Sequence, residues 1–76
     1  MGNRWTAPER ERLIGYHSGK PVLLQYNSKD PAGFVFCIQH AGNGHYYQTF
    51  QAAVRYMRKR HFLRKKDNLQ EADFLQ

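Results

Sequence analysis

The chain has 76 residues, one cysteine, 41% hydrophobic residues and a net charge of +6. A chain of this length has room for one domain with a modest core, which excludes a large multi-domain enzyme. A single cysteine excludes an internal disulfide framework and most multi-cysteine zinc modules. No apolar run approaches the roughly 20 residues that span a bilayer, and the N-terminal stretch lacks the apolar segment of a signal peptide. We therefore expect a single compact domain over residues 1–76 and a cytoplasmic (intracellular) location.

The first element that we expect is a short N-terminal helix. Thr6 is a suitable N-cap, and Glu9 stands three positions later, as in a capping box. Leu13 and Ile14 would supply the buried contacts of this helix. Turn-forming residues follow Tyr16 and would end the helix there. The pattern predicts about two helical turns.

Three short strands are expected next. Residues 21–26 and 34–39 are apolar runs that contain β-branched and aromatic residues, and a segment dense in turn residues separates them. A tight turn over residues 41–44 then leads into a short third strand over residues 45–48. Consecutive short strands with local turns are typical of an antiparallel meander.

The clearest element is an amphipathic helix that begins after Thr49, a natural N-cap. One stripe of side chains recurs at helical spacing: Phe50, Ala53, Val54, Met57 and His61. Three basic side chains project from the opposite side: Arg55, Arg58 and Lys59. Such a stripe predicts a helix with one buried face. We expect the helix to end near Phe62 or Leu63, because Arg64 would otherwise rotate toward the apolar face.

These elements predict an α+β fold, in which a small three-stranded antiparallel sheet carries a long amphipathic basic helix on one face. A short N-terminal helix and a short C-terminal helix complete the expected order. The C-terminal helix would begin at Asp67, with Gln70 as its capping partner and a weak inward face of three residues: Leu69, Ala72 and Leu75. The other face of the sheet is partly apolar, and it is an interaction patch if nothing covers it.

Positive charge is concentrated in one segment near the C-terminus, residues 55–66. It holds seven basic residues and no acidic one: Arg55, Arg58, Lys59, Arg60, Arg64, Lys65 and Lys66. The rest of the chain carries five positive and six negative charges, a net of −1. Such a segment attracts polyanions such as nucleic acid, an acidic protein surface or anionic lipid. The plainer alternative is a solvated helix face that keeps the protein soluble.

Aromatic residues border the basic segment. Tyr47 precedes the predicted long helix and Tyr56 lies on its flank. Cations bind phosphates and rings can stack on unpaired bases, so the combination favours nucleic acid, either DNA or RNA. The helix has no long polar face that could read bases, and we expect binding by charge and shape. The predicted site therefore consists of the seven basic residues with Tyr47 and Tyr56.

Metal binding and catalysis have weaker support. One set of residues could in principle hold zinc: Cys37, His40, His45 and His61. Their spacing matches no zinc pattern, and alternation directs Cys37 away from the face that the long helix would cover. No carboxylates form an obvious pair and no histidine has a clear orienting partner. We expect no metal, no other cofactor and no enzymatic activity.

A second hypothesis assigns the basic helix to a protein partner. A small accessory inhibitor or adaptor, of the kind that phages use as regulators, could dock on an acidic or nucleic-acid-handling surface of a larger host protein. Exposed aromatic residues would then serve as anchors, because Tyr, Trp and Arg dominate the energetics of interfaces. A membrane-surface role is disfavoured, since the apolar stripe of the long helix is needed to cover the sheet.

Overall fold

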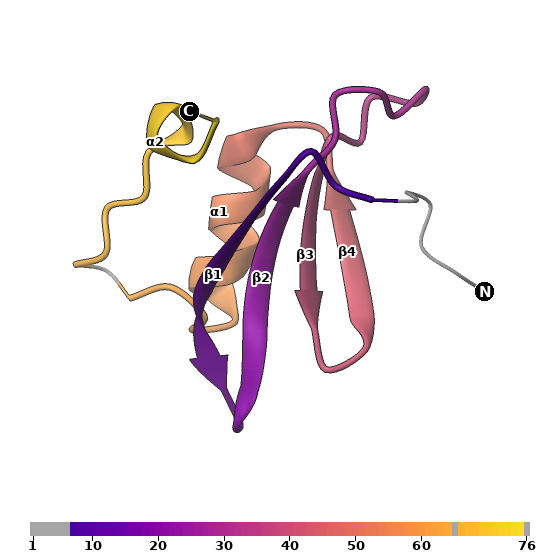
Figure 1. Cartoon of the computed structure of the whole chain (residues 1–76). Coiled ribbons are helices and arrows are strands. Elements are labelled where there is room, and N and C mark those ends of the chain that lie inside the picture. Colours follow the sequence, from indigo (N-terminus) through magenta and orange to yellow (C-terminus); the bar gives the residue numbers. More distant parts are fainter. Residues whose placement is uncertain (1–6, 65, 76) are drawn as a thin grey trace.

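The computed structural model describes residues 7–64 and 66–75 (Figure 1). The chain forms four strands followed by two helices: β1 (Arg10–His17), β2 (Lys20–Tyr26), β3 (Phe36–His40), β4 (Asn43–Tyr47), α1 (Phe50–Lys59) and α2 (Glu71–Leu75). The strands build one antiparallel sheet in the order β1-β2-β3-β4, and α1 lies against one face of it. The fold is thus a four-stranded meander with two short helices, and the expectation of three strands with a long helix is wrong.

The predicted N-terminal helix is wrong, because residues 10–17 form β1. Thr6, its expected N-cap, lies outside the described residues. Glu9 does not close a capping box; its carboxylate accepts hydrogen bonds from the hydroxyl of Ser28 at 2.8 and 3.1 Å. As a helix, this stretch would bury little apolar surface, whereas as a strand it satisfies its backbone groups along β2.

Two-residue turns connect β1 to β2 and β3 to β4. Their central residues, Ser18–Gly19 and Ala41–Gly42, all have positive φ, between 52° and 82°. Positive φ at both central residues defines the type I′ turn, whose twist matches that of the flanking strands. The turn expected over residues 41–44 is therefore shorter than predicted, and its last two residues begin β4.

A β-bulge shapes the first hairpin. Leu13 pairs with Leu23 and Gly15 pairs with Val22, so Ile14 is the extra residue on β1. Ile14 packs against the core, whereas Leu13 is 49% exposed on the other side of the sheet. β1 therefore carries apolar side chains on both faces, as successive residues of a strand point to opposite sides.

The core lies between the sheet and the two helices. Its buried residues are Val22, Leu24, Phe36, Ile38, Phe50, Ala53, Met57, Leu63 and Phe74. α1 packs on β3 and β4, and α2 packs on β1. The last two core residues come from the chain after α1, so the C-terminal segment covers the half of the sheet that α1 leaves free.

α1 ends at Lys59, three to four residues earlier than expected. The amide of Phe62 donates to the carbonyl of Met57 at 2.8 Å, and the amide of His61 donates to the carbonyl of Arg58 at 3.1 Å. This bonding pattern, with a left-handed residue after the cap, is the Schellman motif. His61 occupies the left-handed position with φ 62° and is exposed, so its assignment to the buried stripe is wrong.

The C-terminal helix begins at Glu71 rather than at Asp67. The Asp67 carboxylate accepts hydrogen bonds from the backbone and side chain of Arg64, so it stabilises a turn before the helix. Phe74 is the buried residue of α2, and Ala72, expected to face inward, is exposed. The expected short helix exists, but its start and its inward face differ.

Replacing His61 by glycine should stabilise the protein by about 1 kcal/mol, because only glycine adopts a positive φ without a steric cost. Urea denaturation of wild type and His61→Gly measures the difference. Ala52→Gly is the control, since glycine inside α1 should instead destabilise by about 1 kcal/mol. A destabilised His61→Gly variant would contradict the Schellman geometry.

Candidate functional site

α1 presents its basic side chains to solvent because its apolar side chains are held by the sheet. The hydroxyl of Thr49 accepts a hydrogen bond from the amide of Ala52 at 3.1 Å, which caps the helix as expected. The buried residues of α1 are Phe50, Ala53 and Met57. The opposite side carries three exposed cations and no carboxylate: Arg55, Arg58 and Lys59. Two of them stand in the last turn, where the helix dipole favours positive charge.

Arg55 and Lys59 form the outermost row of α1. They are four residues apart, so their attachment points follow each other by about 6 Å along the helix axis. Within residues 7–64 and 66–75, no hydrogen bond or ion pair engages either side chain. Both cations are therefore available to an external anion.

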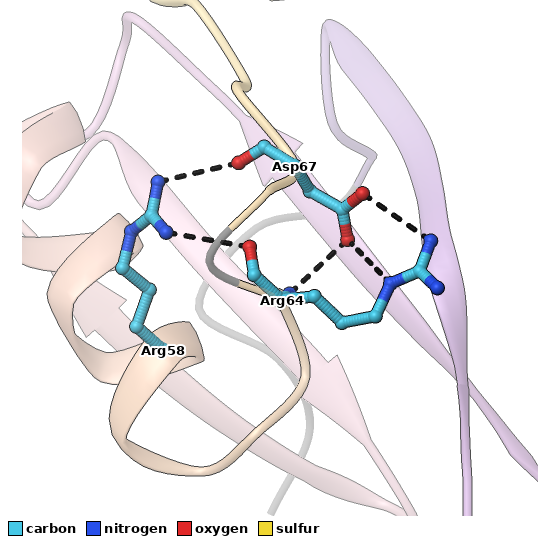
Figure 2. A network of polar contacts seen from close by, with 3 residues as sticks. All are labelled: Arg58, Arg64 and Asp67. Atoms are coloured by element: carbon cyan, nitrogen blue, oxygen red, sulfur yellow. Dashed lines mark hydrogen bonds and ion pairs between the residues drawn. The ribbon is translucent and has the colours of Figure 1, made fainter.

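Arg58 and Arg64 have structural partners, as Figure 2 shows. The guanidinium of Arg58 donates to the carbonyls of Arg64 and Asp67, each at 3.3 Å. Arg64 donates to the two carboxylate oxygens of Asp67 at 3.1 and 3.3 Å. These contacts join the last turn of α1 to residues 64–67. Both arginines remain exposed, and a phosphate would compete with these contacts.

The Arg64–Asp67 pair shifts the titration of both groups. Hydrogen bonds from the Arg64 side chain and then from its backbone amide lower the pKa of Asp67 below its usual value. The same side-chain hydrogen bond raises the pKa of Arg64. Both shifts show that the charged forms of the two groups stabilise each other in the folded chain.

The remaining basic residues follow α1. Arg60 is exposed, and its Cζ atom lies 5.9 Å from the centre of the Phe62 ring. Lys66 is exposed in the turn after Arg64, and Lys65 lies outside the described residues. Arg60 therefore lies at the C-terminal end of α1 beside Phe62, and Lys66 lies on the neighbouring turn.

Tyr47 and Tyr56 meet on the side of α1 that faces the edge strand β4. Their ring centres are 5.7 Å apart, and the exposed His45 lies 4.7 Å from Tyr56 with its ring tilted by 33°. Both tyrosines are half-buried. Burial, followed by the proximity of Tyr56, raises the pKa of Tyr47. Each tyrosine therefore packs on the core and still presents part of its ring.

Three further rings, which are far apart in the sequence, continue from this cluster. Phe62 lies 6.1 Å from Tyr56, and it contacts His40 at 4.8 Å and His17 at 4.9 Å. His40 is oriented by its Nε2, which is 2.9 Å from the carbonyl oxygen of His17. The position of Phe62 beside the basic residues was visible in the sequence, but its histidine contacts depend on the turn at His61.

The other flank of α1 has mixed charge. A groove of about 480 Å³ separates α1 from the segment before α2, and its lining includes Phe50, Val54 and Leu69 together with Arg55, Arg58 and Glu71. The carboxylate of Glu71 disfavours an anion there. An anionic ligand is therefore better accommodated on the outermost row of α1 and on the side of α1 that faces β4.

The residues considered for zinc do not converge. Cys37 pairs with Tyr46, whereas His45 pairs with Ile38, which faces the helices. Burial raises the pKa of the Cys37 thiol, which disfavours the thiolate that a metal requires. Among the described residues, no group of three or more Cys, His, Asp or Glu side chains is arranged to hold a metal ion.

Comparisons with protein-family models, with curated proteins and with solved structures found no match for this chain. Neither helix in the described part of the chain is long and apolar enough to cross a membrane. The functional interpretation therefore depends on the residues and their geometry.

The Arg64–Asp67 pair should make stability depend on pH in acid. Because the folded-state pKa of Asp67 is lowered, its stabilisation is present above its unfolded pKa, near 4, and is lost as pH falls through the lower folded value. The melting temperatures of wild type and of the Asp67→Asn variant should differ at neutral pH and become equal in acid. Asp73→Asn removes an equal charge without breaking a described ion pair, and it should not show this convergence. If the melting temperature of the Asp67→Asn variant still differs from that of wild type in strong acid, the ion pair is not the cause of the difference.

Proposed function

We propose that the protein binds nucleic acid in the cytoplasm, through Arg55 and Lys59 on the outermost row of α1 and through the basic residues that follow α1. The observation that carries the proposal is the row of Arg55 and Lys59, exposed and without a described partner, on a helix that has no carboxylate. The proposed phosphate contacts are Arg55, Lys59, Arg60 and Lys66, with Lys65 expected beside them. Arg58 and Arg64 contribute mainly by holding the turn.

The placement of the acidic residues supports this proposal. Four of the six carboxylates are engaged elsewhere: Glu9 with Ser28, Glu11 with Gln25, Asp30 with its own loop, and Asp67 with Arg64. None of these partners lies on the row of α1. The positive potential of the helix is therefore not neutralised by these four groups.

Such a surface favours phosphate over bases. Lys and Arg bound to phosphate provide affinity and position but carry little sequence information. Gln51 is the one amide side chain on α1, and a single amide reads few bases. We therefore propose binding with little sequence preference and with a strong dependence on salt.

A second candidate is supported by the sheet face opposite α1. There Tyr16 is 69% exposed, and Leu13, at the edge of the sheet, is 49% exposed. An accessory protein that docks on a larger host protein could use this apolar patch together with the basic helix. In that case, binding to the partner would survive moderate salt, because burial of apolar surface is not screened.

Fluorescence anisotropy with labelled DNA and RNA over a salt series tests the proposed function. Four to five phosphate contacts predict a log–log salt slope of about −3 to −4.5 for wild type. Reversing two cations in Arg55→Glu with Lys59→Glu should weaken binding by at least about tenfold at low salt and reduce the slope by about 2. Arg58 is left intact because its loss would disturb the turn as well.

The matched control is Lys20→Glu with Lys29→Glu, which changes the net charge equally at two exposed lysines outside α1. It should retain most of the affinity. Equal loss in both double variants would show that net charge, rather than α1, determines binding. Absence of binding by wild type at low salt would contradict the proposal and favour the protein partner.

A further inference from the structure

Six aromatic and imidazole rings form one continuous belt beside the basic row of α1. We define the ring belt as Tyr47, His45, Tyr56, Phe62, His40 and His17. His45 is exposed, and the other five rings are half-buried. None of the six is fully covered, so the belt is part of the accessible surface.

The rings of the belt follow one another at contact distance. Tyr56 is central, with His45 at 4.7 Å and Tyr47 at 5.7 Å on one side and Phe62 at 6.1 Å on the other. From Phe62 the contacts continue to the two histidines near the hairpin turns. The belt therefore runs from Tyr47 and His45 on the edge strand β4, past the C-terminal end of α1, to His17 at the end of β1.

Cations stand along this belt. Tyr56 lies three and four residues before Lys59 and Arg60, the spacing at which helical side chains are neighbours. Arg60 also lies over Phe62, with 5.9 Å between its Cζ atom and the ring centre. The β4 side of α1 thus combines flat rings with positive charge, whereas the opposite flank carries the carboxylate of Glu71.

We infer that the ligand of this surface is single-stranded nucleic acid. This inference rests on the proposed function and names the class of nucleic acid. The phosphates of the strand bind Arg55, Lys59 and Arg60, and its unpaired bases stack on His45 and on the accessible part of the ring belt. A duplex keeps its bases stacked inside, so it can use the cations but not the rings.

The packing of the belt supports binding without large rearrangement. Tyr47, Tyr56 and Phe62 are already packed against the core, and His40 is oriented by its contact with the His17 carbonyl. Rings fixed in advance lose little conformational freedom when a base stacks on them. Stacking on such rings tolerates every base, which agrees with a surface that has few groups for reading sequence.

The test compares labelled oligothymidylate with a labelled duplex of the same number of nucleotides, at the same salt concentrations. Wild type should bind the single strand at least about tenfold more tightly than the duplex, because only the single strand gains the stacking contacts. His45→Ala should weaken single-strand binding about five- to 100-fold and leave duplex binding nearly unchanged.

His61→Gly is the matched control, since it removes another exposed histidine that makes no described ring contact, and glycine keeps the positive φ of the turn. Phe62→Leu is the second variant; it keeps an apolar side chain at the end of α1 and removes the ring. Circular dichroism confirms that each variant is folded. The Phe62→Leu variant should also lose single-strand preference.

Tighter binding of the duplex, or equal losses in His45→Ala and His61→Gly, would overturn the single-strand inference. The proposed function would stand in that case if the Arg55→Glu, Lys59→Glu variant still reduced the salt slope. Failure of wild type to bind either probe at low salt would contradict both.

Discussion

The structure depends on the backbone turn that ends α1, in which His61 adopts the left-handed conformation with positive φ. Without it, the helix would continue away from the sheet and take the C-terminal segment with it. The turn returns Leu63 to the core and lets Phe74 cover the half of the sheet that α1 does not reach. In a chain of this size, these two side chains are a substantial part of the buried apolar surface. The cost of positive φ at His61 is offset by that burial.

The same turn divides the basic residues into two groups. Arg58 and Arg64 lie on either side of it, and with Asp67 they hold the returning chain against α1 (Figure 2). Arg55 and Lys59 lie on the outer row of the helix, where no described partner competes for them. Basic residues that are close in the sequence therefore form two groups in the structure. Arg58 and Arg64 hold the turn, and Arg55 and Lys59 form an exposed row. The turn also places Phe62 between α1 and the histidines, which creates the ring belt.

Part of this arrangement could be predicted from the sequence. Apolar runs identify β2 and β3, the turn before residue 45 locates β4, and helical periodicity identifies α1, each to within a few residues. The prediction of an N-terminal helix is wrong because Thr6 and Glu9 imitate a capping box, whereas Ser18–Gly19 between two runs is a hairpin signal and not a helix stop. His61 fitted the helical stripe by spacing alone, and no glycine marked the turn. The ring belt was not predictable, because it joins residues that only the hairpins and this turn bring together.

The central claim is that Arg64 is a structural residue whereas Arg55 is free to bind phosphate. Proton–nitrogen NMR of the arginine side chains measures this directly, with and without added oligothymidylate. The Nε–H signal of Arg64 should exchange with water more slowly than that of Arg55, because it donates to Asp67 at 3.1 Å, and it should barely move when the nucleic acid is added. The Arg55 signal should shift strongly on binding. Equal shifts of the two signals, or equal exchange rates in the free protein, would contradict this assignment of the two arginines.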